Sequence, residues 1–430
     1  MSNIVLRFIH ASDFRLEAPL VGIAEAADSL RLSLIDAPFQ AATAVFDVAL
    51  ERRVDFVLLT GNLLDPRAAG PRGIAFLVEQ FERLDAAGIA VYWFSNEIDA
   101  PERWPASIEL PANVHQFDAG RGDCLLHWRE GQTIAKLGPL AALPLRRTPH
   151  TDYAATTDAA EERIFTIGLA HGAAPAVDAR TPFDYLALGG QPNRHIAHSG
   201  VPWIVQAGSP QGRSIAEAGP HGCTLVEVDS ERHVRVALRT SDTVRWREEQ
   251  ISLDDCLHRT RWESALRERI AAITAEAGDR VVLLRLRLTP GLNPMTRTQR
   301  ARLADELLAW LRETYATAAQ SVWAIAVDHE PATNDTAVHE HDTILGEFLR
   351  TIDDLRDQPV DGLRLREYAG ATVLTSDLLD QLDCTTSDVR DPLLRQIAEL
   401  GYELLGGNAV EPPATNTAPV KNFGRIHSAV

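Results

Sequence analysis

The sequence predicts an α/β protein in which a β-sandwich is flanked by helices. Strand-like and helix-like segments alternate from residue 3 to about residue 100, which is typical of a parallel sheet with right-handed crossovers. From about residue 112 to residue 240 the segments become a run of short strands, which predicts a second, more antiparallel sheet. A small α+β module and C-terminal helices are expected to follow.

The first three strands and two helices are each indicated by a local pattern. "IVLRFIHASD" is a strand that ends in a polar turn, and "VDFVLLTGN" is a buried apolar run that stops at Gly61-Asn62. Asp36 and Pro38 are helix start signals, so the first helix is expected from there. "IAVYWFS" predicts the third strand. The second helix is indicated by apolar residues at helical spacing before Gly88, namely Ile74, Leu77, Phe81 and Leu84.

Pattern and composition divide the chain into four parts. Residues 1–245 form the α/β domain, and residues 246–332 alternate helix and strand as a small α+β capping module. Residues 333–405 are expected to be helical, and residues 406–430, rich in Pro, Asn and Ala, are expected to be a disordered tail. Two amphipathic helical faces are predicted, one with Leu345, Phe348, Ile352 and Leu355 and one with Leu393, Ile397, Leu400 and Leu404.

Bulk composition favours a reduced, cytoplasmic protein. The 430 residues carry a net charge of −18, four scattered cysteines and no run of about 20 apolar residues. We therefore expect no membrane span, and free thiols in place of a disulfide or zinc framework. The N-terminal segment lacks the basic and long apolar regions of a signal peptide. The negative charge opposes non-specific binding to DNA, so DNA binding by this chain alone is expected to be weak.

Polar residues follow the predicted strands at the positions where ligands bind to an open α/β sheet. They occur in five segments along the chain: Asp13 to Arg15, Gly61-Asn62, Ser95 to Glu97, His171-Gly172 and Gly189 to Pro192. Because the carboxyl ends of parallel strands meet at one edge of a sheet, we expect several of these segments to lie together. The sequence therefore places the candidate site at this edge.

In order and spacing these segments resemble the calcineurin-like metallophosphoesterases, and within them the SbcD/YhaO-type DNA repair exonucleases. The resemblance covers about residues 1–240 and rests on "FIHASDFRLEAP", "FVLLTGNLLD", "IGLAHG", "FDYLALGG" and "QAGSPQGRSIAEAGPHGCTLVEVD". It implies a four-layer αββα sandwich and a family motif set of D-x-H, G-D, G-N-H-D, a lone H-G and G-H-x-H. It also implies two divalent ions, such as Mn²⁺, about 3.5–4 Å apart, that clamp a phosphodiester.

Most of the residues that the family uses are changed in this chain. The positions that keep a possible ligand are Asp13, Asn96 and His171. The changed positions are Arg15 for the histidine of D-x-H, Asn62 for the bridging aspartate, Glu97 for the catalytic histidine, and Gly190 and Pro192 for the last two histidines. The resemblance therefore implies a degenerate site that holds no metal. If a metal were bound, its ligands would come from Asp13, Asn62, Asn96 and His171.

Two of the changes suggest how such a site is stabilised. Arg15 places a permanent cation where the first metal would lie, so we expect it within salt-bridge distance of Asp13 or Glu97. Asn62 suits a site with no metal to bridge, because its amide can hydrogen-bond to neighbours without adding buried charge.

Other residue groups admit a functional and a structural interpretation. His195 and His198 could be substitute metal ligands, although they lie past the lost motif. "DHEPATNDTAVHEHD" looks metal-like but is better explained as a solvated helix start. Arg285 and Arg287 alternate along one strand, so they form either a charged sheet face or a weak contact to nucleic-acid phosphates.

Three functions are compatible with these observations. The first is a catalytically impaired or inactive homologue that acts in DNA processing with an SMC-like ATPase, a partner that the resemblance implies. The second is an active phosphodiesterase or exonuclease with an altered one-metal site. The third is a scaffold without a nucleic-acid role, which the net charge of −18 favours. A homodimer is left open.

Overall fold

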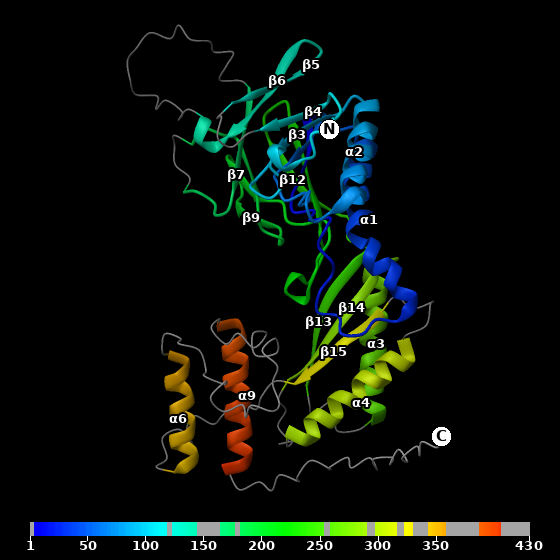
Figure 1. Ribbon diagram of the computed structural model, residues 1–430, viewed down its shortest axis with the longest axis vertical. Coiled ribbons are helices and arrows are strands. Elements are labelled where there is room, and N and C mark those ends of the chain that lie inside the picture. Colours follow the sequence, from blue (N-terminus) through cyan, green and yellow to red (C-terminus); the bar gives the residue numbers. More distant parts are fainter. Residues whose placement is uncertain are drawn as a thin grey trace, which may run out of the picture. The chain divides into compact units, whose positions relative to one another are not determined.

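The computed structural model describes residues 4–117, 123–143, 164–176, 181–252, 259–289, 297–315, 322–329, 343–357 and 387–405 (Figure 1). These residues belong to two compact units. The larger unit comprises Met1–Ile251, Asp255–Arg287 and Glu306–Asp328, and the smaller comprises Ser252–Asp254, Leu288–Asp305 and His329–Val430. The domain boundaries predicted at residues 245 and 332 stay predictions, and the predicted tail at 406–430 lies outside the described residues.

The first sheet, sheet A, has six strands in the order β12-β11-β1-β2-β3-β4. The strands β1, β2, β3 and β4 are mutually parallel, which confirms the predicted β-α-β-α-β arrangement, and β11 pairs antiparallel with β1 and with β12. The strands of sheet A are β1 (Ile4–Ala11), β2 (Phe56–Leu59), β3 (Ala90–Phe94), β4 (Val114–Phe117), β11 (Gly222–Asp229) and β12 (Val234–Thr240).

The second sheet, sheet B, has six strands in the order β5-β6-β7-β8-β10-β9. Its four central strands β6, β7, β8 and β10 are parallel, and only the edge strands β5 and β9 pair antiparallel. The strands of sheet B are β5 (Leu125–Arg129), β6 (Gln132–Pro139), β7 (Phe165–His171), β8 (Tyr185–Gly189), β9 (His195–His198) and β10 (Trp203–Gln206).

Two expectations about the second sheet were wrong. The sheet is not mainly antiparallel, because its central strands run in the same direction. The two strands at 222–240, which were expected in it, belong to sheet A instead. The reason is the pairing of β11 with β1, in which Arg7 lies opposite Glu227 and donates to its carboxylate at 2.7 Å. Period and length predict strands, but they do not identify the partner of each strand.

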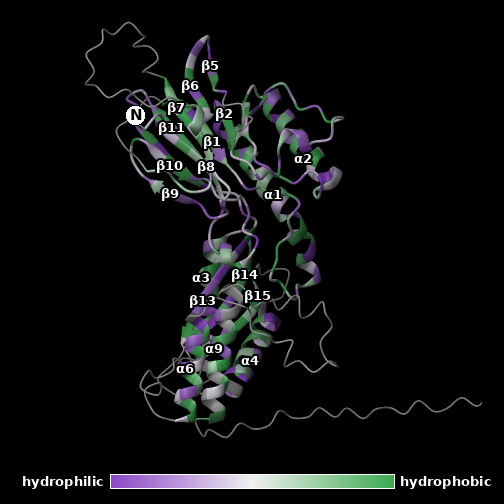
Figure 2. Ribbon diagram, turned by 60° about the vertical axis from the view of Figure 1, so that its left-hand side comes forward, coloured by the Kyte–Doolittle hydropathy of each residue, from purple (hydrophilic) through white to green (hydrophobic). Residues whose placement is uncertain are grey.

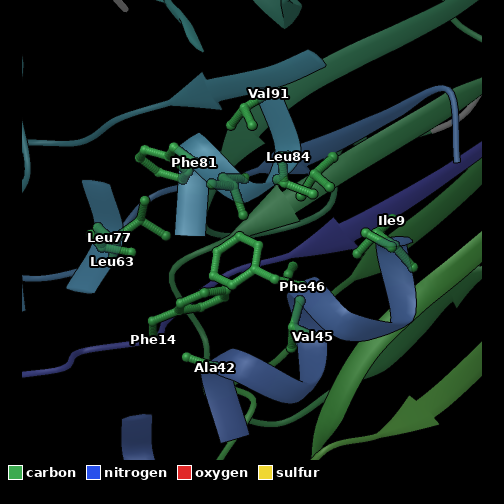
Figure 3. Close-up of a cluster of buried hydrophobic side chains, with 14 of the residues drawn as sticks. Ile9, Phe14, Ala42, Val45, Phe46, Leu63, Leu77, Phe81, Leu84 and Val91 are labelled. Atoms are coloured by element: carbon green, nitrogen blue, oxygen red, sulfur yellow. The ribbon is translucent and has the colours of Figure 1, made fainter. Parts of the chain in front are cut away.

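Two hydrophobic cores lie on the two faces of sheet A. One is formed by that sheet and the helices α1 (Asp28–Arg52) and α2 (Gly70–Ala86), and it includes the ring contacts of Phe46 with Phe14 and Phe81 (Figure 3). The other lies between sheets A and B. Figure 2 shows hydrophobic colour in the strands around β1 and β8. The predicted fold class, a mixed α/β protein with two large sheets and flanking helices, is confirmed.

Helix α1 starts earlier than the sequence indicates. It begins at Asp28, so Pro38 lies inside the helix and not at its start. The additional turns are stabilised by packing, because Leu30, Leu34 and Ala37 contact a separate hydrophobic cluster around Trp246 and Trp323. Tertiary contacts therefore outweigh the usual cost of an interior proline.

A third sheet follows, in the order β13-β14-β15. Helix and strand alternate after residue 250 as predicted, in α3 (Arg259–Ala277), β14 (Val281–Thr289), α4 (Arg297–Tyr315) and β15 (Val322–His329). The strand β13 (Val244–Ser252), which was not predicted, precedes them. Trp323 on β15 donates its indole N–H to the Glu25 carbonyl at 2.8 Å, so this sheet is tied to the segment before α1.

The helices α6 (Ile344–Asp357) and α9 (Ser387–Leu405) pack on each other in the smaller unit (Figure 1). Leu345 and Ile352 of α6 contact Leu394 and Ala398 of α9. The buried face of α9 is therefore rotated from the predicted one. Among the predicted face residues, Leu355, Leu400 and Leu404 are 37%, 37% and 57% exposed. In the described part of the chain no helix is long and apolar enough to cross a membrane.

Candidate functional site

The candidate site lies where the loops after β1 and β2 run side by side beyond the ends of their strands. The backbone N–H of Asp13 donates to the Gly61 carbonyl at 3.0 Å, and that of Arg15 donates to the Asn62 carbonyl at 2.9 Å. Asp13, Arg15 and Asn62 all have positive φ, of 56°, 42° and 56°. Non-glycine residues rarely adopt this region, and such strain collects at functional sites.

Glycine is required where the strand ends approach one another. A Cβ on Gly61 would lie 2.7 Å from His171 Nε2, and one on Gly189 would lie 1.9 Å from the Thr60 carbonyl oxygen. Gly61 also has a φ of 78°, which favours glycine. The loops after β1 and β2 are thereby brought against the ends of β7 and β8, so sheets A and B both contribute to the site.

The Asp13 carboxylate is the buried centre of the site, and it is surrounded by neutral donors. It is 1% exposed. Its Oδ1 accepts a hydrogen bond from Asn62 Nδ2 at 2.7 Å. Its Oδ2 accepts bonds from Ser12 Oγ at 2.6 Å and from the Gly190 backbone N–H at 3.0 Å. Hydrogen bonds to a charged acceptor are strong, so these three donors stabilise the buried charge.

Asn62 and Asn96 extend these hydrogen bonds into a chain in which each amide NH₂ group donates toward Asp13. Asn62 must present its NH₂ group to Asp13, because an ionised carboxylate only accepts. The Asn62 carbonyl oxygen is then free to accept from Asn96 Nδ2, with which it is in hydrogen-bond contact. The Asn96 carbonyl oxygen in turn accepts the Ile98 backbone N–H at 2.8 Å. We call Asp13, Asn62 and Asn96 the amide relay.

A second buried carboxylate, Asp99, fixes the loop that carries the amide relay. Asp99 is fully buried and accepts the backbone N–H groups of Asn96 at 2.8 Å and Leu63 at 3.0 Å. It also accepts the indole N–H of Trp93 at 3.2 Å. Burial raises the pKa of Asp99, and these N–H donors oppose the shift. Sequence reasoning missed this role, and its only signal was an acidic residue three positions after Asn96.

His171 also belongs to the site, and stacking on an aromatic ring fixes the orientation of its imidazole. It stacks on Phe94, with the ring centroids 4.6 Å apart and an angle of 17° between the planes. Burial lowers the pKa of His171, against the opposing influence of the Thr60 backbone and the Asp13 carboxylate. Its Nε2 atom is buried without a hydrogen-bond partner. The neutral His171 ring therefore keeps an unused polar atom at the site.

The expectation that Arg15 pairs with Asp13 or Glu97 was wrong. The Arg15 side chain is exposed, and among the described residues no ion pair joins it to either carboxylate. Glu97 is exposed as well, and its backbone carbonyl accepts from Arg103 at 3.1 Å. The physical reason is that neutral donors already satisfy Asp13, so an added buried ion pair would bring a desolvation cost without an unmet acceptor.

Arg213 supports the loop of Asp13 from the opposite side. This guanidinium is 6% exposed and contacts the Phe14 carbonyl, and it donates to the Arg15 carbonyl at 3.1 Å and the Gln211 carbonyl at 3.4 Å. Burial lowers the pKa of Arg213. Because its partners are backbone carbonyls, Arg213 holds the shape of the turn.

The positions that replace the family's last two histidines contribute only backbone. Gly190 donates its N–H to Asp13, and the Pro192 carbonyl accepts from the Ser209 backbone N–H at 2.8 Å. Neither residue has a side chain that could bind an ion. Nearby on β9, His198 Nδ1 is in hydrogen-bond contact with the Pro202 carbonyl at 2.6 Å.

The residues present do not fit a pair of divalent ions. Both oxygens of Asp13 face N–H or O–H donors, and Asn62 directs its NH₂ group at Asp13, where a bridging ligand would have to offer an acceptor. A neutral amide also cannot balance two dications as a carboxylate does. In the described part of the chain, no group of three or more His, Cys, Asp or Glu residues could hold a metal ion.

The remaining candidate residues lie apart from the site or outside the described residues. Arg285 is paired with Asp328 at 2.5 Å, and Arg287 with Glu248 at 3.0 Å, so both guanidiniums lie on a charged sheet face. The metal-like stretch is described only at Asp328 and His329, and its other residues lie outside the described ranges. Contact of the two arginines with nucleic acid stays a prediction.

Comparison with known proteins supports a class for this fold and site. No family model matches the chain. The uncharacterized metallophosphoesterase YhaO of Bacillus subtilis (strain 168) is 27% identical over 371 residues, which cover 82% of this chain and 88% of YhaO. The solved structure of YfcE, a phosphoesterase from E. coli, aligns with 12% identity and a TM-score of 0.25 over 54% of this chain and 99% of its own. A TM-score of that size does not establish a shared fold.

The two-sheet α/β fold, with polar residues collected at the strand ends, is consistent with a metallophosphoesterase. Sequence similarity to YhaO extends over most of both chains. The chain is thus similar to a metallophosphoesterase over most of its length.

Proposed function

We propose that this chain is an SbcD/YhaO-like homologue that is catalytically impaired or inactive and serves as a subunit in DNA processing beside an SMC-like ATPase. The observation that carries the loss of activity is the 2.7 Å hydrogen bond from Asn62 to Asp13. In the two-metal chemistry of this superfamily, a carboxylate at the Asn62 position would bridge the ions that activate water and hold the phosphate. Here the same position donates a hydrogen bond, so that chemistry has no bridging ligand.

The expected size of the defect follows from the number of groups lost. Removing one well-placed group that stabilises a transition state costs a factor of about 10²–10³ in rate. The chain lacks the bridging carboxylate at Asn62, the histidine at Glu97 and the ligands at Gly190 and Pro192. We therefore expect that digestion of a DNA end with Mn²⁺ stays at background.

The test is an end-labelled duplex incubated with the full chain and Mn²⁺, beside a homologue that retains every motif residue. Asp13→Ala and His171→Ala are expected to leave the background unchanged. Mn²⁺-dependent digestion that both variants abolish would refute the proposal and establish the alternative, an active enzyme with one metal held by residues among Asp13, Asn62, Asn96 and His171.

A scaffold without a nucleic-acid role is the second alternative, and the net charge of −18 favours it. The ion pairs of Arg285 and Arg287 also reduce the positive charge available to a phosphate. Affinity for duplex DNA, measured for the complex with the ATPase at several salt concentrations, separates the two roles. Binding that weakens steeply with salt supports DNA processing, and no binding by the complex supports the scaffold.

The proposed dock for the ATPase is the outer surface of the α6–α9 pair. Leu355, Leu400 and Leu404 stay exposed after the two helices have packed together, and Leu405 at the end of α9 is 45% exposed. Exposed leucines on a helix pair are typical of an interaction surface. The ATPase as the partner comes from the resemblance to the SbcD/YhaO type.

We expect the double variant Leu400→Asp, Leu404→Asp to lose co-purification with the SMC-like ATPase of the same cell. Charges at these exposed positions should leave the fold intact, because surface substitutions usually change stability by less than about 0.5 kcal/mol. The matched control is Leu126→Asp, which alters a 42% exposed leucine on β5. Equal recovery of the ATPase with all three proteins would exclude this surface as the dock.

A further inference from the structure

The amide relay connects parts of the chain that a shared ion would otherwise hold together. Asp13 follows β1, Asn62 follows β2 and Asn96 follows β3, and Gly190 after β8 of the other sheet donates to the same carboxylate. Among Asp13, Asn62 and Asn96, the side-chain hydrogen bonds that join these strand ends are those from Asn62 to Asp13 and from Asn96 to Asn62. Each donor in the relay has one acceptor, and each direction is fixed by the carboxylate at one end and by the Ile98 N–H at the other.

We propose that the amide relay is a metal-independent fastening of these strand ends, and that Asn62 is the residue that excludes divalent ions from it. The Asn62 side chain is 4% exposed, so its NH₂ group cannot turn to solvent when a cation approaches. A cation bound by Asp13 would have to displace the Asn62 donor and leave it buried without a partner, which is costly. The inference deepens the proposed loss of activity and assigns a structural role to the residues that remain.

The experiment compares thermal unfolding of the full chain in EDTA and in Mn²⁺ for four proteins. Wild type is expected to unfold at the same temperature in both. Asn62→Asp places a second carboxylate beside Asp13, so it should unfold roughly 5 °C lower in EDTA and recover in Mn²⁺, because the two carboxylates can then share the ion. Asn62→Leu removes the hydrogen bonds without adding a ligand, so it should be destabilised in both conditions.

The matched control is Asn113→Asp. Asn113 is a half-buried asparagine whose NH₂ group donates to two backbone carbonyls, those of Ile89 at 2.9 Å and Phe81 at 3.3 Å. Its replacement also removes donors and adds a carboxylate, but the hydrogen-bond partners of Asn113 are backbone carbonyls and not a second carboxylate, so Mn²⁺ should not restore its unfolding temperature. Recovery of this variant would show that the Mn²⁺ response is not specific to the relay.

Four results would overturn the inference: saturable stabilisation of wild type by Mn²⁺, an Asn62→Asp variant as stable as wild type in EDTA, an Asn62→Asp variant that Mn²⁺ does not restore, or an Asn62→Leu variant as stable as wild type. If Asn62→Asp does not fold, wild type and Asn62→Leu still test the inference. The proposed fastening requires that Mn²⁺ leave the unfolding temperature of wild type unchanged and that Asn62→Leu be less stable than wild type. Failure here is separable from failure of the proposed function. Mn²⁺ that stabilises an inactive wild-type chain overturns the fastening alone, and DNA digestion that depends on Asp13 overturns the proposed function.

Discussion

Replacing Asp99 with alanine should lower the free energy of unfolding by about 3–5 kcal/mol, since each buried donor left without a partner costs about 1–3 kcal/mol. The carboxylate is fully buried and accepts N–H groups of Asn96, Leu63 and Trp93. Alanine removes all three acceptor contacts and leaves a cavity as well. In the native protein Asp99 satisfies all three donors directly.

Urea unfolding followed by far-ultraviolet circular dichroism measures this loss. The matched control is Asp85→Ala, an exposed aspartate on α2, for which the change should stay within about 0.5 kcal/mol. A loss for Asp99→Ala no larger than that of the control would show that the loop after β3 is not held by this carboxylate. The variant should also loosen the amide relay, because Asn96 is fixed through its backbone N–H to Asp99.

The second large effect is a loss of stability in mild acid that depends on His10. This ring is fully buried between the two sheets, with Nδ1 2.9 Å from the Tyr185 hydroxyl and Nε2 3.0 Å from the Thr60 hydroxyl. Burial, and to a smaller extent the nearby Arg194 guanidinium, lower the pKa of His10 from 6.5 to about 3. The folded protein therefore keeps this ring neutral through the range in which an unfolded chain protonates it.

The direction of the pH dependence follows from the difference in the pKa of His10 between the folded and the unfolded states. Above pH 6.5 neither state binds the proton, so the contribution of His10 to stability is fully present. As the pH falls from 6.5 toward 3, only the unfolded state takes up the proton, and stability drops by up to about 1.4 kcal/mol per pH unit. Between pH 6.5 and 4.5 the loss is roughly 2 kcal/mol from this residue. The pKa values of His171 and His127 are also lowered by burial, so they add to the slope in the same direction.

Unfolding free energies of wild type and His10→Gln between pH 7 and 4.5 test this account. The glutamine variant is expected to start from a lower stability and to show a shallower dependence on pH. The control is His195→Gln on β9, where the ring is exposed and the slope should match wild type. Parallel curves for wild type and His10→Gln would mean that His10 does not cause the acid sensitivity.

Much of the fold could be predicted because central strands of the two sheets, such as β2 and β8, are buried apolar runs. β2 is buried at every position and stops at Thr60, and this pattern is visible in the sequence. The start of α1 could not be predicted, because Leu30 and Leu34 gain their partners only when the third sheet is in place. The sheet to which β11 belongs also depends on a pairing across more than two hundred residues, Arg7 with Glu227.

For the site, the sequence located the residues but not their connections. Asp13, Asn62, Asn96 and His171 were expected at neighbouring strand ends, and the structure brings Asp13, Asn62 and Asn96 into one hydrogen-bonded chain. Arg15 was expected to neutralise the Asp13 carboxylate, but the neutral donors of Ser12, Asn62 and Gly190 satisfy it. Asp13 is buried and Arg15 is exposed, in a turn with φ values of 56° and 42°, and such backbone values cannot be read from residue types. Asp99 was missed because its role depends on three donors that are distant or unremarkable in the sequence.

The central claim is that Asn62 and its neighbours leave no place for the superfamily's pair of ions. The most direct test is elemental analysis of the purified full chain after incubation with excess Mn²⁺ and removal of unbound ions by gel filtration. The account predicts a metal content far below stoichiometric, unchanged in Asp13→Ala. A stoichiometric pair of ions per chain, lost when Asp13 or His171 is replaced by alanine, would contradict it.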